Sequence, residues 1–593
     1  MKPIRRALCS LSLLLAAAAL APHVATAGEP IVLTMPRYAQ FDTLDPVQTF
    51  STISDQLLQS VYSTLLNYAY LERPYKMEPG LLAAMPTLSA DRLTLTFRLR
   101  GGVRFTDSPC FPGGKGRVVD SDDVLYSIKR FADGRLNDKT WWAMKDAVQG
   151  LDAYRAATLR AAPGVDLTGS DVAGLRKVDA TTFTIRLTHD NPLFLYAFAM
   201  TATSIVPPEA VRFYKDRFGL NPVGTGPFHV EKELDRKGVI RLLKNPDYYG
   251  VYPSVGEPGD AARGLLKDAG KRLPLVDVLE LPLIEENQPG ALKFLRGEID
   301  WRFLDRANFA KLIRRTPDGG FAVADEYASR FGISYTTAPG IVYVGLNMKD
   351  PILGRNKALR QALAAAIDVQ AEIDVLLNGR GRKLDSIVPY ELPGNERDTG
   401  APPHHKDVAL AKRLLADAGY PGGVGLPPLT MSFYLTDSDT RNMFDLLRAQ
   451  FAAIGVQLKG AFQDAPAFLK ATGSGNFQLA YYDWTADYPD AEDFYQLLYS
   501  RNVAPGPNIA AYANPAYDRA YQASRLMPNG PARYAWFKTM NALIEDDAPL
   551  IGIFDPLRFG IFQKWVGNYK RNPLTIENSY LRIDPIARKK GQQ

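Results

Sequence analysis

Apolar and polar residues alternate strictly in two stretches of this chain, and each stretch predicts a strand with one buried side. Between residues 92 and 100 every second side chain is Leu or Phe. Residues 183–187 repeat the pattern with Phe, Ile and Leu at alternate positions. A period of two residues is typical of a strand that packs one face on a core.

Helical spacing predicts helices between and after these strands. Asp120 or Ser121 can cap a helix over about 121–130, because both side chains can accept from free backbone N–H groups. Apolar residues at 359, 363, 367 and 373 predict a helix that Gly379 ends. The remaining expected elements are a helix from Asp407 to Gly419, a helix over 444–454, a strand starting at Val456, and a buried strand over 477–482. The pattern indicates a mixed α/β protein of two lobes or more.

The first residues have the composition of an export signal. Lys2, Arg5 and Arg6 precede an apolar core from Leu8 to Leu20, and Ala25-Thr26-Ala27 offers a small-x-small cleavage site. The apolar run is too short to be a convincing membrane span. Because Cys9 precedes this core, whereas a lipid-attachment Cys would follow it, we expect a signal peptide over 1–27 and no lipid anchor.

Charge and cysteine content narrow the class of protein further. Removing the three basic residues of the signal changes the formal charge from +6 to +3, which gives no support to a nucleic-acid partner. Cleavage leaves Cys110 as the one cysteine, so no internal disulfide is expected. The length of 593 residues points to more than one domain with sizeable cores.

The most informative chemistry lies in residues 483–490, which read Asp-Trp-Thr-Ala-Asp-Tyr-Pro-Asp directly after the predicted strand. A carboxylate between aromatic side chains suits a ligand with a positive end and an apolar body. The alternative is a turn in which Asp487 caps a helix and Pro489 stops the strand. Taken alone, this stretch does not decide between the two readings.

An enzyme is the main rival class. The chain has no Gly-x-Ser-x-Gly elbow and no His-Glu-x-x-His helix. The pairs Glu285-Glu286 and Asp546-Asp547 are adjacent in sequence, so their side chains diverge and a solvated or capping role is favoured. With five His in all, a metal site has few ligands to draw on, and His404-His405 lies in a Pro-rich loop. We therefore expect no catalytic residues, no metal and no cofactor.

Several segments of the sequence, taken in order along the chain, match the pattern of one protein family. It resembles the extracytoplasmic solute-binding proteins of family 5, the peptide- and nickel-type receptors of ABC importers. The segments that carry the resemblance are Leu44-Asp45-Pro46, Gly102-Val103-Arg104-Phe105, Asp123 to Arg130, the Gly-rich turn Asn221 to Phe228, Asn245 to Tyr249, Gly297-Glu298-Ile299-Asp300, Arg360 to Asp368, Leu414 to Tyr420, Trp484 to Pro489 and Glu545 to Pro549. Each is weak alone, but the ordered set is specific.

The resemblance implies an α/β, two-lobed periplasmic-binding-protein fold (type II, cluster C) with an extra N-terminal subdomain. Lobe I would combine 28–66, 190–325 and 545–593; the subdomain would be 67–189, and lobe III would be 326–544. Because the chain would cross between the lobes more than once, the hinge would consist of short strands, which suits rigid-body closure on a ligand. Segments 108–118, 148–174 and 251–273 look longer than the family pattern, and surface decoration is favoured over a role at the cleft rim.

The resemblance also implies the site. In peptide-binding relatives the Asp of the Ala-Asp-Tyr segment pairs with the ligand's α-amino group, and Asp487 holds that position here. The other expected ligand-binding residues are Trp484, Thr485, Tyr488, Phe50, Ser51, Thr52, Trp141 and Trp142. The alignment is loose at the two Trp residues.

The function implied is that of a monomeric periplasmic receptor that captures an oligopeptide or peptide-like solute and delivers it to an inner-membrane ABC permease. Because the Asp487 signature persists in relatives that bind other solutes, a receptor for an oligosaccharide or a metal chelate is the alternative. A secreted hydrolase built from distant carboxylates is the remote one.

Overall fold

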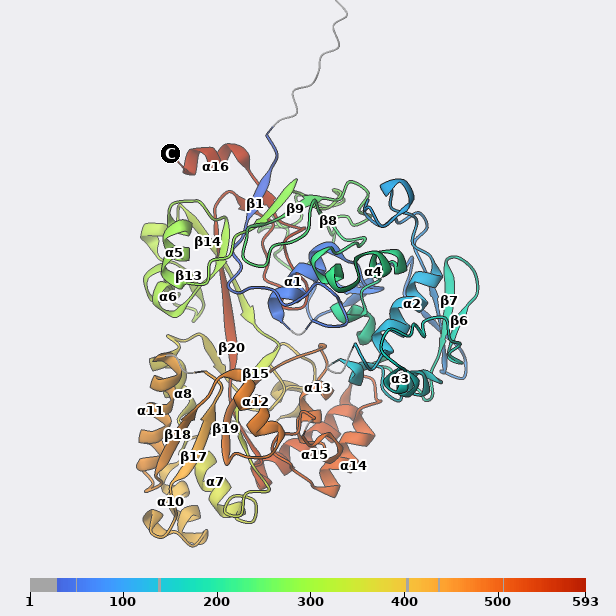
Figure 1. The fold of residues 1–593 in the computed structure, drawn as a ribbon. Coiled ribbons are helices and arrows are strands. Elements are labelled where there is room, and N and C mark those ends of the chain that lie inside the picture. The colour runs from blue at the N-terminus through green and yellow to red at the C-terminus, as the bar shows by residue number, and fades with distance from the viewer. Residues whose placement is uncertain are drawn as a thin grey trace, which may run out of the picture.

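A computed structural model describes residues 29–49, 51–136, 140–400, 405–435, 438–504 and 506–592. Two lobes lie one above the other in Figure 1. We call them the upper lobe, which contains the elements from β1 to β14 and the C-terminal end of the chain, and the lower lobe, which contains those from β15 to α15. The expected signal segment, 1–27, lies outside the described residues.

The upper lobe contains two four-stranded sheets. The first has the order β1 (Val32–Thr34), β10 (Val278–Leu281), β9 (Ile240–Lys244) and β8 (Phe228–Val230). The second has the order β4 (Thr87–Leu88), β5 (Thr94–Arg98), β7 (Thr182–Arg186) and β6 (Leu175–Lys177). In the second sheet, Phe97 lies opposite Phe183 and Leu95 opposite Ile185, all four buried. Both strands predicted from alternation are therefore confirmed, with their apolar faces on the core.

One long strand joins the two lobes. The largest sheet has the order β11 (Trp301–Phe303), β20 (Leu550–Gln563), β15 (Gly340–Leu346), β19 (Leu479–Thr485), β17 (Leu429–Phe433) and β18 (Leu458–Phe462), and β14 (Phe331–Thr337) and β16 (Gly381–Lys383) also pair with β20. The first residues of β20 pair with β15 in the lower lobe, and its last seven pair with β14 in the upper lobe (Figure 1). The chain thus crosses between the lobes along β20, a strand of 14 residues, and again between β14 and β15, which both pair with β20.

The remaining strands form three small two-stranded sheets. These are β2 (Leu66–Tyr68) with β3 (Met77–Pro79), β12 (Ile313–Arg315) with β13 (Phe321–Val323), and β21 (Val566–Gly567) with β22 (Arg582–Ile583). All three belong to the upper lobe.

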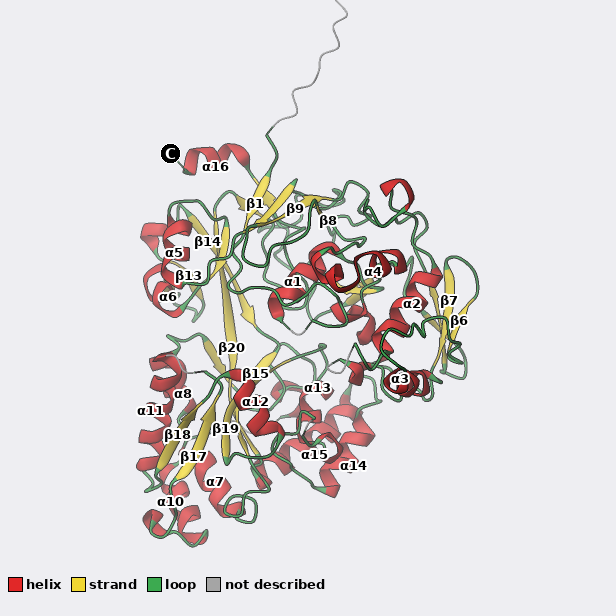
Figure 2. Cartoon of the chain, in the orientation of Figure 1, coloured by secondary structure: helices red, strands yellow, loops and turns green. Residues whose placement is uncertain are grey.

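Helices flank these sheets in both lobes (Figure 2). In the upper lobe they are α1 (Thr52–Val61), α2 (Ser121–Ala132), α3 (Leu151–Arg160), α4 (Pro208–Tyr214), α5 (Asn287–Leu295), α6 (Arg306–Leu312) and α16 (Pro585–Gly591). In the lower lobe they are α7 (Lys357–Ala366), α8 (Val369–Ala371), α9 (Glu396–Thr399), α10 (Val408–Asp417), α11 (Ser438–Ala452), α12 (Ala465–Gly473), α13 (Glu492–Tyr495), α14 (Pro515–Ser524) and α15 (Pro531–Asp547).

The predicted caps are confirmed where a side chain can accept from the first turn. Asp120 caps α2 and forms a capping box with Asp123. Asp407 caps α10 by accepting from the backbone N–H of Leu410 at 2.8 Å, and Gly419 follows that helix with a φ of +91°. These helix boundaries follow from local chemistry.

The single helix predicted up to Gly379 is broken in the structure. α7 ends before Ile367, and Asp368 begins a new turn by accepting from the backbone N–H of Ala371 at 3.0 Å. A π-helical turn, Glu372–Leu376, follows α8. The apolar spacing is helical, as predicted, but the side chain of Asp368 caps the backbone inside the run and divides it.

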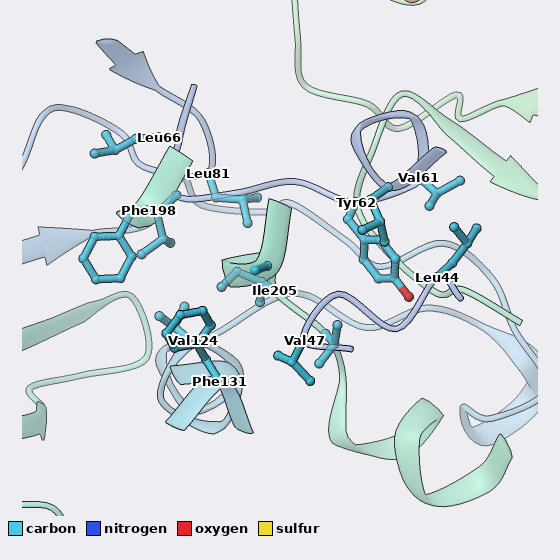
Figure 3. Packing of buried hydrophobic residues seen from close by; sticks show 14 of the residues in the cluster. Leu44, Val47, Val61, Tyr62, Leu66, Leu81, Val124, Phe131, Phe198 and Ile205 are labelled. Atoms are coloured by element: carbon cyan, nitrogen blue, oxygen red, sulfur yellow. The ribbon is translucent and has the colours of Figure 1, made fainter. Parts of the chain in front are cut away.

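Each lobe has its own hydrophobic core. Figure 3 shows part of the upper core, in which Val124 and Phe131 of α2 pack near Phe198 and Ile205. In the lower lobe the large sheet is covered on both faces. One core lies between the sheet and α7, α10 and α11, and the other between the sheet and α13 to α15. Because both faces of this sheet are covered by helices, it is the ends of its strands that face the upper lobe.

The three segments that look inserted belong to the upper lobe. Segment 148–174 contains α3, and segment 251–273 is tied down by Lys570, whose Nζ donates to carboxylates of Glu257 and Asp260 at 2.5 and 2.7 Å. Segment 108–118 contains Cys110, a half-buried free thiol whose pKa is raised by burial. Among the described helices, none is both long enough and apolar enough to cross a membrane.

Candidate functional site

The end of β19 places the Asp483–Asp490 segment at the gap between the lobes. β19 is central in the lower sheet and extends to Thr485, which pairs with Gly340, so it is longer than the predicted strand. Ala486 still donates its backbone N–H to Pro339 at 2.7 Å. The chain leaves the sheet at Asp487, directly beside the crossing between β14 and β15.

Asp487 has a backbone partner but no side-chain partner. Its N–H donates to Oδ2 of Asp493 at 3.1 Å, whereas its carboxylate has no hydrogen bond or ion pair among the described residues. The first N–H of α13 is bonded instead by Asp490, the residue before the N-cap Ala491, whose Oδ1 accepts from the backbone N–H of Glu492 at 2.9 Å. The helix-cap interpretation of Asp487 is therefore wrong, because the first turn of α13 is satisfied by another acid.

Burial and a carboxylate of the upper lobe raise the pKa of Asp487. Its side chain is exposed to solvent, yet the protein around it is dense enough that burial raises its pKa to about 7, with Asp55 of α1 as the second cause. These observations agree if the carboxylate faces a cleft, where water reaches it but surrounding protein limits its hydration. The pKa of Asp55 is also raised, first by burial.

A third acid lies directly behind Asp487. Asp493 is fully buried, and burial, followed by the charge of Asp487, raises its pKa well above the ordinary range. Its Oδ2 accepts from the indole N–H of Trp484 at 3.0 Å, and its Oδ1 accepts from Gln496 at 2.8 Å. Three acids with no basic ion-pair partner among the described residues make this region favourable for a cation.

Buried polar contacts fix the segment that carries Asp487. The guanidinium of Arg533 donates to both oxygens of Asp490, at 2.8 and 2.7 Å, and both side chains are almost fully buried. The hydroxyl of Tyr488 donates to Glu492. Because neighbouring side chains hold both flanks, the position of Asp487 is pre-organised.

Aromatic contacts close the gap next to this segment. The ring of Tyr488 lies between Trp142, with centroids 5.7 Å apart, and Tyr196, with centroids 5.3 Å apart. Both partners belong to the upper lobe, so Tyr488 is a point of contact between the lobes. Trp141, in contrast, is buried in the upper core against Phe131, with centroids 6.4 Å apart.

The predicted site residues near α1 have different surroundings. Ser51 caps α1 through its side chain and donates to Asp42 at 2.9 Å, so its hydroxyl has a structural role. Thr52 is the first residue of α1 and is exposed. Phe50 lies outside the described residues.

Sequence reasoning missed Asp55, Asp493 and Tyr68. The hydroxyl of Tyr68 is buried without a hydrogen-bond partner among the described residues, and its pKa is raised by burial and then by Tyr196 and Asp493. Tyr68 lines a polar cavity of about 60 Å³ together with Thr201, whose hydroxyl donates to Asp55 at 2.6 Å. No local pattern indicates these contacts, because they depend on how the two lobes meet.

The two pairs of adjacent acids, Glu285-Glu286 and Asp546-Asp547, do not form an acid–base site. Asp547 accepts from the hydroxyl of Tyr512 at 2.6 Å and from Asn514 at 2.9 Å, and Asp546 pairs with Lys357 at 2.5 Å. Glu285 and Glu286 are exposed. Within the described parts of the chain, no group of three or more His, Cys, Asp or Glu side chains is arranged to hold a metal ion.

The sequence matches a family of bacterial binding proteins over most of its length. The family model described as "Bacterial extracellular solute-binding proteins, family 5 Middle" matches residues 76–505. The chain is 24% identical to Di/tripeptide-binding protein 2 of Pseudomonas aeruginosa (strain UCBPP-PA14), over 95% of this chain and 97% of that protein. It is 25% identical to the dipeptide-binding protein of Escherichia coli (strain K12), over 84% of each.

A solved structure gives the same fold. The periplasmic binding protein DppA from Helicobacter pylori, in complex with the peptide STSA, superposes with a TM-score of 0.70 at 22% identity, over 93% of this chain and 98% of that one. The two-lobed fold expected from the sequence is therefore confirmed.

Proposed function

Since this chain belongs to the bacterial extracellular solute-binding proteins of family 5, we propose that it is a periplasmic receptor that captures an oligopeptide or peptide-like solute between its lobes. The receptor then delivers the solute to an ABC permease of the inner membrane. It acts as a monomer after removal of residues 1–27 and performs no chemistry on its ligand. The similarity to a di/tripeptide-binding protein and to a dipeptide-binding protein supports a peptide as the solute.

The observation that carries this proposal is the carboxylate of Asp487 at the interlobe gap, which has no ion pair within the described part of the chain. An α-amino group placed there would form a charge-assisted hydrogen bond, which contributes roughly 1.5–3 kcal/mol. It would also offset the mutual repulsion of Asp487, Asp55 and Asp493. Ligand binding would then favour the closed arrangement of the lobes, because only that arrangement brings acids from both lobes to one cation.

The same proposal assigns the other parts of the site and the domains. Trp484, Thr485 and Tyr488 line the lower side of the cleft, and Trp142 with the start of α1 lines the upper side. Trp141 is left out because it packs inside the core. Lobe I would comprise 28–66, 190–325 and 545–593, with the subdomain 67–189, and lobe III 326–544. Within these bounds β14 pairs with the last residues of β20 in the upper lobe, and the first residues of β20 pair with β15 in the lower lobe.

Two measurements test the proposal. Native mass spectrometry of gently purified protein should detect a bound peptide, and a retained oligosaccharide or metal chelate would support the alternative receptor instead. Titration with Ala-Ala-Ala-Leu and its N-acetylated form should show tighter binding of the free amine. The variant Asp487→Asn should bind both forms alike, and if it still discriminates between them, Asp487 does not bind the amino group.

A further inference from the structure

The polar cavity beside α1 lies within the upper lobe. Its volume is about 60 Å³, and its lining comes from α1, β2, the turn around Thr201 and the C-terminal segment that contains Thr575. None of the described residues that line it belongs to the lower lobe. The cavity therefore does not need the lobes to approach each other, and in this it differs from the cleft at Asp487.

Hydrogen bonds between distant parts of the chain build the walls of the cavity. The backbone N–H of Ile576 donates to Oε1 of Gln59 at 2.7 Å. The hydroxyl of Thr575 donates to the backbone carbonyl of Tyr68 at 3.1 Å. These bonds fasten the C-terminal segment to α1 and β2, so the cavity is already formed in the folded upper lobe, as small-molecule sites usually are.

The lining of the cavity is polar but uncharged. Among the described residues that line it, none is Asp, Glu, Lys, Arg or His. Its polar groups are the hydroxyls and amides of Ser, Thr, Tyr, Asn and Gln side chains. An ion would find no counter-charge in this lining, whereas a neutral hydroxyl group can both donate to it and accept from it.

Two hydroxyls of the lining residues have no hydrogen-bond partner. Tyr68 is 5% exposed and Ser63 is 7% exposed, and neither hydroxyl has a hydrogen bond among the described residues. A buried polar group without a partner costs free energy. An occupant that bonds these hydroxyls is therefore favoured over an empty cavity.

Aromatic carbon lies beside these hydroxyls. Tyr62, Tyr248 and Tyr580 belong to the same lining. Waters can bond the hydroxyls but leave the carbon surface wet, whereas a polyol bonds through its oxygens and packs its carbons on the rings. Since one water needs about 10–15 Å³ of such a volume, the cavity has room for about four waters, or for one three-carbon triol that displaces them.

We propose that this cavity is a second binding site, which takes a small neutral polyol of the size of glycerol and acts independently of the interlobe cleft. It goes beyond the proposed function, which concerns the cleft alone. The site excludes an anion of similar shape. Thr201 of the lining donates to Asp55 at 2.6 Å, and burial, followed by Tyr196 and Asp493, raises the pKa of Tyr68. A carboxylate in the cavity would therefore lie close to acids.

Saturation-transfer NMR with three matched compounds tests the site. Glycerol should bind with a Kd on the order of millimolar, as expected for so small a ligand. Propane-1,3-diol, which lacks the middle hydroxyl, should bind about fivefold more weakly, and glycerate should not bind. Equal signals from all three compounds, or no signal from glycerol, would overturn the inference.

Variants of the lining locate the bound polyol. Ala199→Leu adds side-chain volume inside the cavity and should abolish glycerol binding. Tyr68→Phe and Ser63→Ala each remove an unpaired hydroxyl, so each should weaken glycerol about fivefold without lowering the unfolding temperature. Ser170→Ala removes an exposed hydroxyl elsewhere in the upper lobe and serves as the control with unchanged binding. If Ala199→Leu does not fold, the Tyr68→Phe result decides, and wild-type affinity in that variant would refute the site.

Competition separates this site from the peptide cleft. A saturating amount of Ala-Ala-Ala-Leu should leave glycerol binding unchanged, because the two sites do not share their lining. Displacement of glycerol by the peptide would make the cavity part of the cleft and would overturn the inference. If glycerol binds as expected but no peptide binds, the cavity site stands and the proposed receptor function fails.

Discussion

Peptide binding should weaken strongly between pH 7 and pH 5, because the acid that holds the amino group must be ionised. In the ligand-free protein, burial and then Asp55 raise the pKa of Asp487 to about 7. An ammonium group bound there favours the carboxylate and lowers this pKa. Affinity is therefore full above the ligand-free pKa and is lost as the pH falls through it toward the pKa of the complex.

The size of the effect follows from the fraction of ionised Asp487. At pH 5, two units below a pKa of about 7, only about 1% of the ligand-free protein carries the charge, so affinity should be about 100-fold below its plateau. Above about pH 8 the α-amino group of the peptide loses its proton, which lowers affinity on the other side. The expected optimum lies between these two limits.

Calorimetry of Ala-Ala-Ala-Leu at pH 5, 6, 7 and 8 measures this profile. Repeating the titrations in buffers of different ionisation enthalpy should show about one proton released per peptide bound near pH 6. Asp487→Asn should flatten the acid limb. Asp55→Asn should shift that limb to lower pH, because it removes the like charge that contributes to the raised pKa. An affinity that stays constant from pH 7 to pH 5, or an acid limb that persists in Asp487→Asn, would refute the reasoning.

Three further predictions concern stability and closure. The raised pKa means that ionised Asp487 destabilises the empty receptor. Asp487→Asn should therefore raise the thermal unfolding temperature at pH 8, as measured by scanning calorimetry. This gain should shrink as the pH falls below about 7, where Asp487 of the wild type becomes protonated. Arg533→Gln leaves Asp490 buried without its cation and should cost about 3–5 kcal/mol, seen as an earlier urea transition; an unchanged transition would contradict the structural role of the pair. Trp142→Ala removes a ring that contacts Tyr488 in a tilted arrangement, a contact worth about 0.5–1.5 kcal/mol. It should increase the radius of gyration in X-ray scattering without ligand, whereas an unchanged radius would show that this contact does not hold the lobes together.

Local chemistry made several elements predictable from the sequence. The alternating residues of β5 and β7 fix which faces meet, because a period of two residues leaves only one side to bury. The cap at Asp120 and the glycine at Gly419 mark helix ends through contacts within a few residues. The position of Asp487 just beyond a buried strand was also visible, since the apolar run ends shortly before it.

Prediction was less accurate where competing local and distant contacts decide the outcome. The apolar spacing around Ile367 is compatible with one helix, but the cap formed by Asp368 divides it. Trp141 and Trp142 are neighbours of the same type, yet one packs in a core and the other reaches the opposite lobe. Their different roles depend on which lobe lies beside each ring.

The sequence by itself determined the family, the mixed α/β composition, and the acid that carries the proposed function. Only the tertiary structure brought Asp55 of the upper lobe to Asp487 of the lower lobe and left the Asp487 carboxylate without a partner among the residues that the structure describes. It alone also formed the polar cavity beside α1. The physical reason is that a strand or a cap is specified by interactions over a few residues. A cleft arises from two separately packed lobes, and its charges and volume depend on where the hinge strand β20 places them.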